Sequence, residues 1–282
     1  MRAFAVLFSA GFRRYATYRR ATLAGAFTNT VFGYVRAAVL TTAITGATVG
    51  AAVSATATGG GSSAGSGTVA GYTAGQAVTY AWISQGLIAS VMLFAWNELA
   101  LRVRTGDIAV DLARPVDLQW SWLAGDLGRA TYLLLPRGGP PVLVGALTTG
   151  LLLPHTAWPY LLGGLSTVLA VVVSFAGRFL VNLAAFWLTE VRGLVGAYAG
   201  IGAIFGGLLI PLSWFPDWLR VIAWSTPFPA MLQVPVDVLT ARVDGATAVR
   251  LVVVQLLWAT TMLAAGRVML RLATRKLVVQ GG

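Results

Sequence analysis

The side chains with the clearest chemical potential lie in one charged segment, residues 98–117, of an otherwise apolar chain. The segment reads ELALRVRTGDIAVDLARPVD and holds four acidic residues and three arginines. Gly106 precedes a short amphipathic stretch from Ile108 to Leu112, and Pro115 ends it because proline cannot continue a helix. Such a helix can enter a groove on a partner protein, with charge pairs that set its register. A solvated loop whose charges only orient the chain is the other interpretation.

Residue types needed for catalysis or metal binding are otherwise scarce. The chain has no cysteine and a single histidine, His155, which excludes thiolate and histidine-cluster metal sites. It contains no GxxxxGKS/T phosphate loop, no HExxH motif and no glycine-flanked serine nucleophile. We therefore expect no catalytic residue, no metal and no cofactor bound by this chain, so any ATP hydrolysis would come from another polypeptide.

Arg178 lies deep in an apolar stretch, about 18 Å along a helix from Glu190. A buried arginine is costly in lipid and has to face a partner, a water-filled cavity or a substrate path. Asn182 follows one helical turn later and shares its face. These two residues predict either part of a translocation path or an intramembrane pairing, with carbonyls or with a carboxylate on a neighbouring helix. Arg36, near the outer end of the first apolar stretch, is expected to snorkel outward.

The overall composition indicates that these apolar stretches lie in a lipid bilayer. Hydrophobic residues make up 57% of the chain and charged residues 10%, whereas about a quarter of the residues in soluble domains are charged. We therefore predict an all-α polytopic membrane protein, with one transmembrane domain over residues 1–282 in the lipid bilayer. The net charge of +11 comes from arginines at the ends of apolar stretches, which sets topology and does not indicate nucleic acid.

Apolar runs and the charges between them predict about six transmembrane helices. They cover residues 21–48, 75–96, 120–153, 160–187, 194–210 and 251–270. The third is broken near Arg137 by the sequence GGPP at residues 138–141. Residues 59–67, which read GGGSSAGSG, are typical of a flexible external loop.

The segments outside these stretches complete the predicted topology. Residues 1–20 suit an amphipathic interfacial helix on the inner membrane surface, and a frayed basic tail is the alternative. Residues 98–117 form a cytoplasmic connection between the second and third helices. Residues 211–250, rich in tryptophan and proline, form re-entrant or interfacial helices at the outer surface between the fifth and sixth. Arginines near both ends place both termini in the cytoplasm.

With the segments placed, the chain resembles the permease subunits of type-2 ABC exporters, small bacterial membrane proteins that work with a separate ATPase subunit. The most specific match is ELALRVRTGDIAVDLARP, because this family has a charged loop of the form E, basic, then R/S-G-D/N-I, then D-L-x-R-P. Supporting matches are FRRYATYRRATLAGAFTN, SFAGRFLVNLAAFW, TPFPAMLQVPVDVL and the VVQGG end. Together they extend over nearly the whole chain.

The resemblance implies a cytoplasmic coupling helix between the second and third membrane helices. Its contact with the ATPase would be carried by Gly106, Asp107, Ile108, Asp111, Arg114 and Pro115, with Arg102 and Arg104 orienting the loop. Two permeases, identical or homologous, would dock two copies of the ATPase, which bind ATP and Mg. The complex would export a small amphipathic compound, such as a drug, an antibiotic or an organic cation, across the bacterial cytoplasmic membrane.

Other functions stay open at this point. An ATP-independent secondary transporter or channel would need intramembrane carboxylates or discontinuous helices around an ion site. No acidic residue is expected near the middle of a span, which argues against proton coupling. A silent assembly half of a heteromeric permease pair, or an importer, would share the features above.

Overall fold

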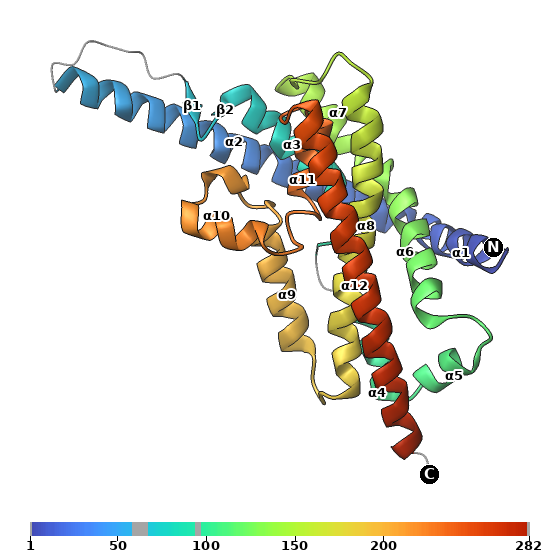
Figure 1. The fold of residues 1–282 in the computed structure, drawn as a ribbon. Helices are drawn as coiled ribbons and strands as arrows, with labels where there is room; N and C mark the ends of the chain where they lie inside the picture. Colours follow the sequence, from blue (N-terminus) through green and yellow to red (C-terminus); the bar gives the residue numbers. More distant parts are fainter. Residues whose placement is uncertain (1, 58–66, 94–96, 281–282) are drawn as a thin grey trace.

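The computed structural model describes residues 2–57, 67–93 and 97–280 (Figure 1). Regular structure in these ranges is overwhelmingly α-helical, which confirms the predicted all-α class. The exception within them is a small hairpin in which β1 (Thr68–Val69) pairs antiparallel with β2 (Tyr72–Thr73). Of the predicted flexible loop at residues 59–67, all but Gly67 lies outside the described residues.

The helices follow one another along the chain without a repeated unit. They are α1 (Arg2–Thr17), α2 (Arg19–Ala57), α3 (Ala74–Val91), α4 (Glu98–Thr105), α5 (Ile108–Ala113), α6 (Leu118–Leu134), α7 (Gly139–Thr148), α8 (Trp158–Leu183), α9 (Arg192–Phe205), α10 (Asp217–Trp224), α11 (Gln233–Leu239) and α12 (Gly245–Gln280). Two short 3-10 helices, η1 (Ala184–Phe186) and η2 (Leu212–Trp214), follow α8 and precede α10.

α8 lies at the centre of the bundle and packs against α12, α11, α6 and α3. A buried polar contact joins the N-terminal half of α8 to α12. Ser166 Oγ donates to Gln255 Oε1 at 2.8 Å, and Gln255 Nε2 donates to the carbonyl oxygen of Ala230 at 2.7 Å. Because both side chains are buried, the amide of Gln255 joins α8, α12 and the chain before α11 where water does not compete.

Two helical segments, Trp158–Phe186 and Gly245–Arg275, are long and apolar enough to cross a membrane. They coincide with the predicted fourth and sixth spans. The first is largely buried inside the protein, whereas the second leaves most of its surface exposed to the surroundings. α9 is also apolar but has only 14 residues. The full set of about six membrane helices stays a prediction.

The predicted break in the third apolar stretch is present. α6 ends at Leu134, and α7 begins at Gly139 with a proline in its first turn, where the missing N–H costs nothing. The break also lets α3 come close, because a Cβ atom at Gly138 would collide with the carbonyl oxygen of Gly86. The sequence GGPP therefore serves a close backbone contact as well as the bend.

The second apolar stretch forms a shorter helix than predicted. α3 ends at Val91 and Met92 adopts a left-handed conformation with φ of 57°, whereas the prediction extended the helix to residue 96. Residues 94–96 lie outside the described residues. Helix α4 then starts at Glu98. The early end of α3 is a consequence of tertiary contacts described below.

α2 is longer than the predicted first span. Its 39 residues correspond to about 58 Å, almost twice the thickness of the hydrocarbon core of a bilayer. Figure 1 shows α2 running behind the bundle, with its C-terminal end projecting beyond the other helices at the upper left. A helix of this length has to tilt or extend past the membrane surface.

Arg36 does not snorkel outward, so that expectation is wrong. The side chain is buried, and its Nη1 donates to Ser84 Oγ on α3 at 2.6 Å. The helix face that carries Arg36 is the one that packs on α3, where Gly33 leaves room for the ring of Trp82. Among the described residues, Nε and Nη2 of Arg36 have no hydrogen-bond partner.

The segment between α9 and α12 is not confined to the surface. α11 is almost wholly buried against α8, while the exposed side of α10 presents Trp218 and Val221. Gln233 fixes α11 to the rest of the protein, because its Oε1 accepts from Tyr80 Oη at 2.7 Å and from the backbone N–H of Leu212 at 3.1 Å. The predicted interruption by prolines therefore produces one exposed and one buried short helix.

α1 packs against α6 at very close range. Glycines make this possible: a Cβ atom at Gly128 of α6 would collide with the carbonyl oxygen of Phe8, and one at Gly11 would collide with the backbone of Gly125. The rings of Phe12 and Tyr132 add an edge-to-face contact at 5.3 Å between centroids. The helix predicted for residues 1–20 is thus present and is held by backbone approach.

Gly128→Ala is expected to push α1 away from α6 and to destabilise the protein by about 1–3 kcal/mol, the usual cost of overpacking. Gly125→Ala is the matched control on the same helix, because its added Cβ would meet nothing within 4 Å. The thermal unfolding midpoint in detergent, together with the rate of proteolysis within α1, checks this. Equal behaviour of the two variants would contradict the close packing.

Candidate functional site

The charged segment folds as two short helices joined at a glycine. α4 ends at Gly106, whose φ of 83° lies in the left-handed region that glycine adopts without strain. Thr105 Oγ1 donates to Asp107 Oδ2 at 2.7 Å across this turn, and α5 follows. A turn at Gly106 therefore separates α4 from α5.

α5 is fixed to its own chain along one face. Ile108 is completely buried and packs in a cluster with Leu99 and Leu118. Asp111 is also buried and accepts from Arg102 Nε at 2.5 Å, with Arg114 Nη1 at 3.6 Å. In this structure Ile108 and Asp111 therefore position the helix, and they are not part of an exposed contact surface.

The opposite face of α5 is open. Val110 leaves 59% of its surface exposed, whereas Ile108 in the same predicted amphipathic stretch is buried. Residues two apart in a helix lie on different faces, which separates Ile108 from Val110. Of the residues predicted to carry or orient the contact, those exposed here are Arg104, Gly106, Asp107, Arg114 and Pro115, whereas Arg102 is half-buried.

Ion pairs and a cap tie this segment to four other parts of the protein. Arg14 of α1 binds both carboxylate oxygens of Glu98, at 3.2 and 3.3 Å, and this hydrogen bond raises the pKa of Arg14. Arg104 pairs with Glu190 at 3.4 Å, in the connection before α9. The remaining two ties are an ion pair between Asp117 and Arg267 of α12 and the cap provided by Asn182 of α8.

Asn182 acts at the start of α4. Its Oδ1 accepts from the backbone N–H of Ala100 at 3.0 Å, and its Nδ2 donates to the carbonyl oxygen of Arg178 at 2.8 Å. The first N–H groups of a helix have no partner within the helix, and a side-chain oxygen commonly satisfies one of them. Here the oxygen comes from α8, so Asn182 joins α4 to the central helix.

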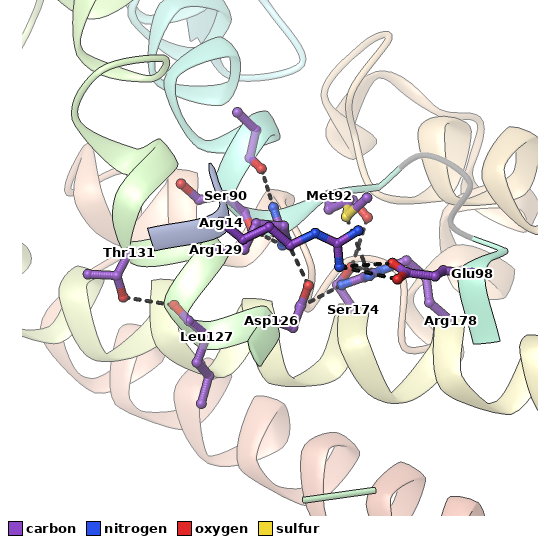
Figure 2. Close-up of polar contacts among 11 residues, drawn as sticks. Arg14, Ser90, Met92, Glu98, Asp126, Leu127, Arg129, Thr131, Ser174 and Arg178 are labelled. Carbon is purple, nitrogen blue, oxygen red and sulfur yellow. Dashed lines mark hydrogen bonds and ion pairs between the residues drawn. The ribbon is translucent and has the colours of Figure 1, made fainter. Parts of the chain in front are cut away.

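A buried ion cluster lies one turn deeper (Figure 2). Asp126 of α6 accepts from Arg129 Nε through Oδ1 and from Arg178 Nη2 through Oδ2, both at 2.8 Å. The side chains of Arg129 and Arg178 are only 4% and 2% exposed. Arg178 therefore pairs with a carboxylate on a neighbouring helix, which was one of its two predicted roles. The other, a part in a translocation path, stays a prediction.

Arg129 of this cluster, together with Ser174, also binds the backbone carbonyls at the end of α3. Arg129 Nη1 and Nη2 donate to the carbonyl oxygens of Ala89 and Ser90 at 2.7 and 2.8 Å, and Ser174 Oγ donates to that of Met92 at 3.1 Å. The last carbonyls of a helix lack internal partners and favour a nearby positive charge. These contacts explain why α3 ends before the predicted boundary.

Asp126 was not predicted as a site residue. It lies near the start of the predicted third stretch, residues 120–153, so the expectation of no acidic residue near the middle of a span stays a prediction. It lies halfway along α6 and is enclosed by two arginines. The sequence carried a weak signal, since Asp126 and Arg129 are three residues apart in an apolar stretch and so share a helix face. The partner from α8 could not be read from that spacing.

A cavity of about 350 Å³ connects the ion cluster with the charged segment. It is enclosed by α1, α4, α5, α6 and α8, and reaches from Asp126 to Arg114. Among the described residues, no three His, Asp or Glu side chains lie together so that they could hold a metal ion. The arrangement can bind charged groups and transmit movement between helices.

The comparisons with known proteins give one match. Residues 63–281 match the family model described as "ABC-2 family transporter protein", and this range holds every helix from α3 to α12. No curated protein and no solved structure matches the chain.

Asp126→Asn is expected to destabilise the protein by about 3–5 kcal/mol, because it leaves two buried guanidinium groups without a counter-charge. Asp217→Asn is the matched control: Asp217 also pairs with an arginine three residues later, at 2.7 Å, but is exposed. That change should cost no more than about 1 kcal/mol. Thermal unfolding in detergent measures both, and a similar small effect for the two variants would show that the cluster is not required for stability.

Proposed function

Because the chain belongs to the ABC-2 transporter family, whose members are membrane components of ABC transporters, we propose that it is the permease subunit of an ATP-driven exporter. Membership implies work with an ABC ATPase partner. The ATPase would bind ATP and Mg, and this chain would bind neither. We place it in the bacterial cytoplasmic membrane with both termini inside.

The proposed topology assigns six spans to the observed helices. These are α2, α3, the broken pair α6–α7, α8, α9 and α12. α1 then lies along the inner surface, α4 and α5 form the cytoplasmic connection between the second and third spans, and α10 and α11 belong to the outer segment. Support comes from the apolar length of α8 and α12 and from the arginines near the C-terminal end of α12.

The observation that carries the proposal is the two-sided character of α5. The face that carries Ile108 and Asp111 packs on the rest of the protein, and the opposite face is open around Val110. A coupling helix needs both properties, since a partner can move the spans only through a helix that is rigidly attached to them. The exposed residues Gly106, Asp107 and Arg114 flank the open face.

Movement of α4 and α5 would reach the membrane spans through Asn182 and Arg178. Asn182 joins α4 to α8, and Arg178 joins α8 to Asp126 of α6. When two ATPase subunits close on ATP, the attached segments would shift, and α6 and α8 would move with them between inward-facing and outward-facing forms. Two permeases, identical or homologous, would line the path for a small amphipathic compound.

Co-purification tests the assignment first. The tagged protein is extracted from native membranes in mild detergent, and the accompanying chains are identified by mass spectrometry and assayed for ATPase activity. We expect an ABC ATPase, with or without a second permease. A lone chain without any ATPase would overturn the proposal and favour an ATP-independent transporter or channel.

Val110→Glu is expected to abolish ATPase binding and transport, because it puts a charge at the centre of the open face of α5. The fold should persist, since Val110 is exposed. Val110→Thr keeps the branched shape and is the control that should retain ATPase binding. Co-purified ATPase per permease measures the effect, and full ATPase recovery with Val110→Glu would exclude α5 as the docking helix.

A further inference from the structure

The cavity beneath α1 carries an excess of positive charge. Its walls hold five arginines and three carboxylates. The arginines are Arg14, Arg102, Arg114, Arg129 and Arg178, and the carboxylates are Glu98, Asp111 and Asp126. Two positive charges are therefore left over in a partly enclosed space, where water screens them less than at an open surface.

The arginines form an inner and an outer group. Arg129 and Arg178 are buried and held by Asp126 and by groups at the end of α3, so they belong to the structural cluster. Arg14 and Arg114 lie at the mouth of the cavity, with 60% and 65% of their side chains exposed.

Arg14 and Arg114 have N–H donors that their contacts with the described residues do not use. In their contacts with the described residues, Arg14 and Arg114 each use one nitrogen, Nη1, and Arg114 reaches Asp111 only at 3.6 Å. A guanidinium group has five N–H donors, and its planar fork matches the oxygens of a phosphate. The mouth is thus equipped to bind a phosphate-type anion between α1 and the end of α5.

The position of the mouth indicates where the anion comes from. α1 has no buried residue, and its exposed residues include Phe4, Val6 and Arg13. Residues 1–20 contain five arginines and no acidic residue, a composition that attracts anionic lipids to an interfacial helix. The cavity wall also offers the apolar side chains of Leu7 and Phe175.

We propose that this cavity binds the phosphate headgroup of an anionic phospholipid of the inner leaflet, held by Arg14 and Arg114. The bound lipid would brace α1 against the coupling segment. The excess positive charge disfavours organic cations and the choline of phosphatidylcholine at the same place. The proposal rests on the assignment of α1 to the inner membrane surface, but it needs neither the ATPase nor transport.

The experiment measures lipid retention by the purified full-length chain. Delipidated protein is placed in nanodiscs of phosphatidylcholine with increasing phosphatidylglycerol, and the lipids that remain bound on release are counted by native mass spectrometry. Phosphatidylglycerol should be retained about tenfold better than phosphatidylcholine, because both lipids carry the phosphate but only choline adds a positive charge that the arginines repel. The double variant Arg14→Gln/Arg114→Gln should lose this preference.

Arg13→Gln is the matched control, because it removes one charge from the same helix at a residue that does not line the cavity. It should retain phosphatidylglycerol like the wild type. A loss as large as that of the double variant would overturn the site in favour of general surface attraction. Equal retention of the two lipids, or displacement of phosphatidylglycerol by millimolar inorganic phosphate or glycerol 3-phosphate, would also overturn it, the latter indicating a soluble anion.

Discussion

The ion cluster centred on Asp126 is the constraint on which the rest of the structure depends. One carboxylate balances two guanidinium groups inside an apolar bundle, where an unpaired charge is far more costly than in water. The three side chains come from α6 and α8, and the spare donors of Arg129 bind the last carbonyls of α3. The positions of these three helices along their axes are therefore fixed relative to one another, because sliding any one of them would separate a buried charge from its partner.

The charged segment, residues 98–117, extends this constraint to the surface of the protein. Asn182 lies one helical turn beyond Arg178 and binds both the start of α4 and the backbone of α8. Glu98 at the same end of α4 pairs with α1, and Asp117 beyond α5 pairs with α12. The ends of the segment are thus tied to different helices while its middle, around Val110, stays open. A force applied at the open middle would therefore act on several helices at once.

Long continuous patterns were predictable from the sequence, and contacts between distant residues were not. The apolar lengths of α8 and α12 and the break at residues 138–141 follow from local chemistry. The burial of Arg36 and the early end of α3 follow from neighbours far away in sequence. Within α5, the difference between buried Ile108 and exposed Val110 depends on which side packs on Leu99, and a six-residue helix is too short to show it by periodicity.

The pairing of Arg36 with Ser84 also bears on how the chain enters the membrane. An arginine in a single inserting helix is unfavourable, by up to about 2.5–3.5 kcal/mol on insertion scales when it lies at the helix centre. The hydroxyl group that receives Arg36 is on α3, the next helix to be synthesised after α2. In the proposed topology, where α2 and α3 are consecutive spans, the two helices would therefore be inserted more favourably as a hairpin than one by one, and α2 would stay at the insertion machinery until α3 has emerged.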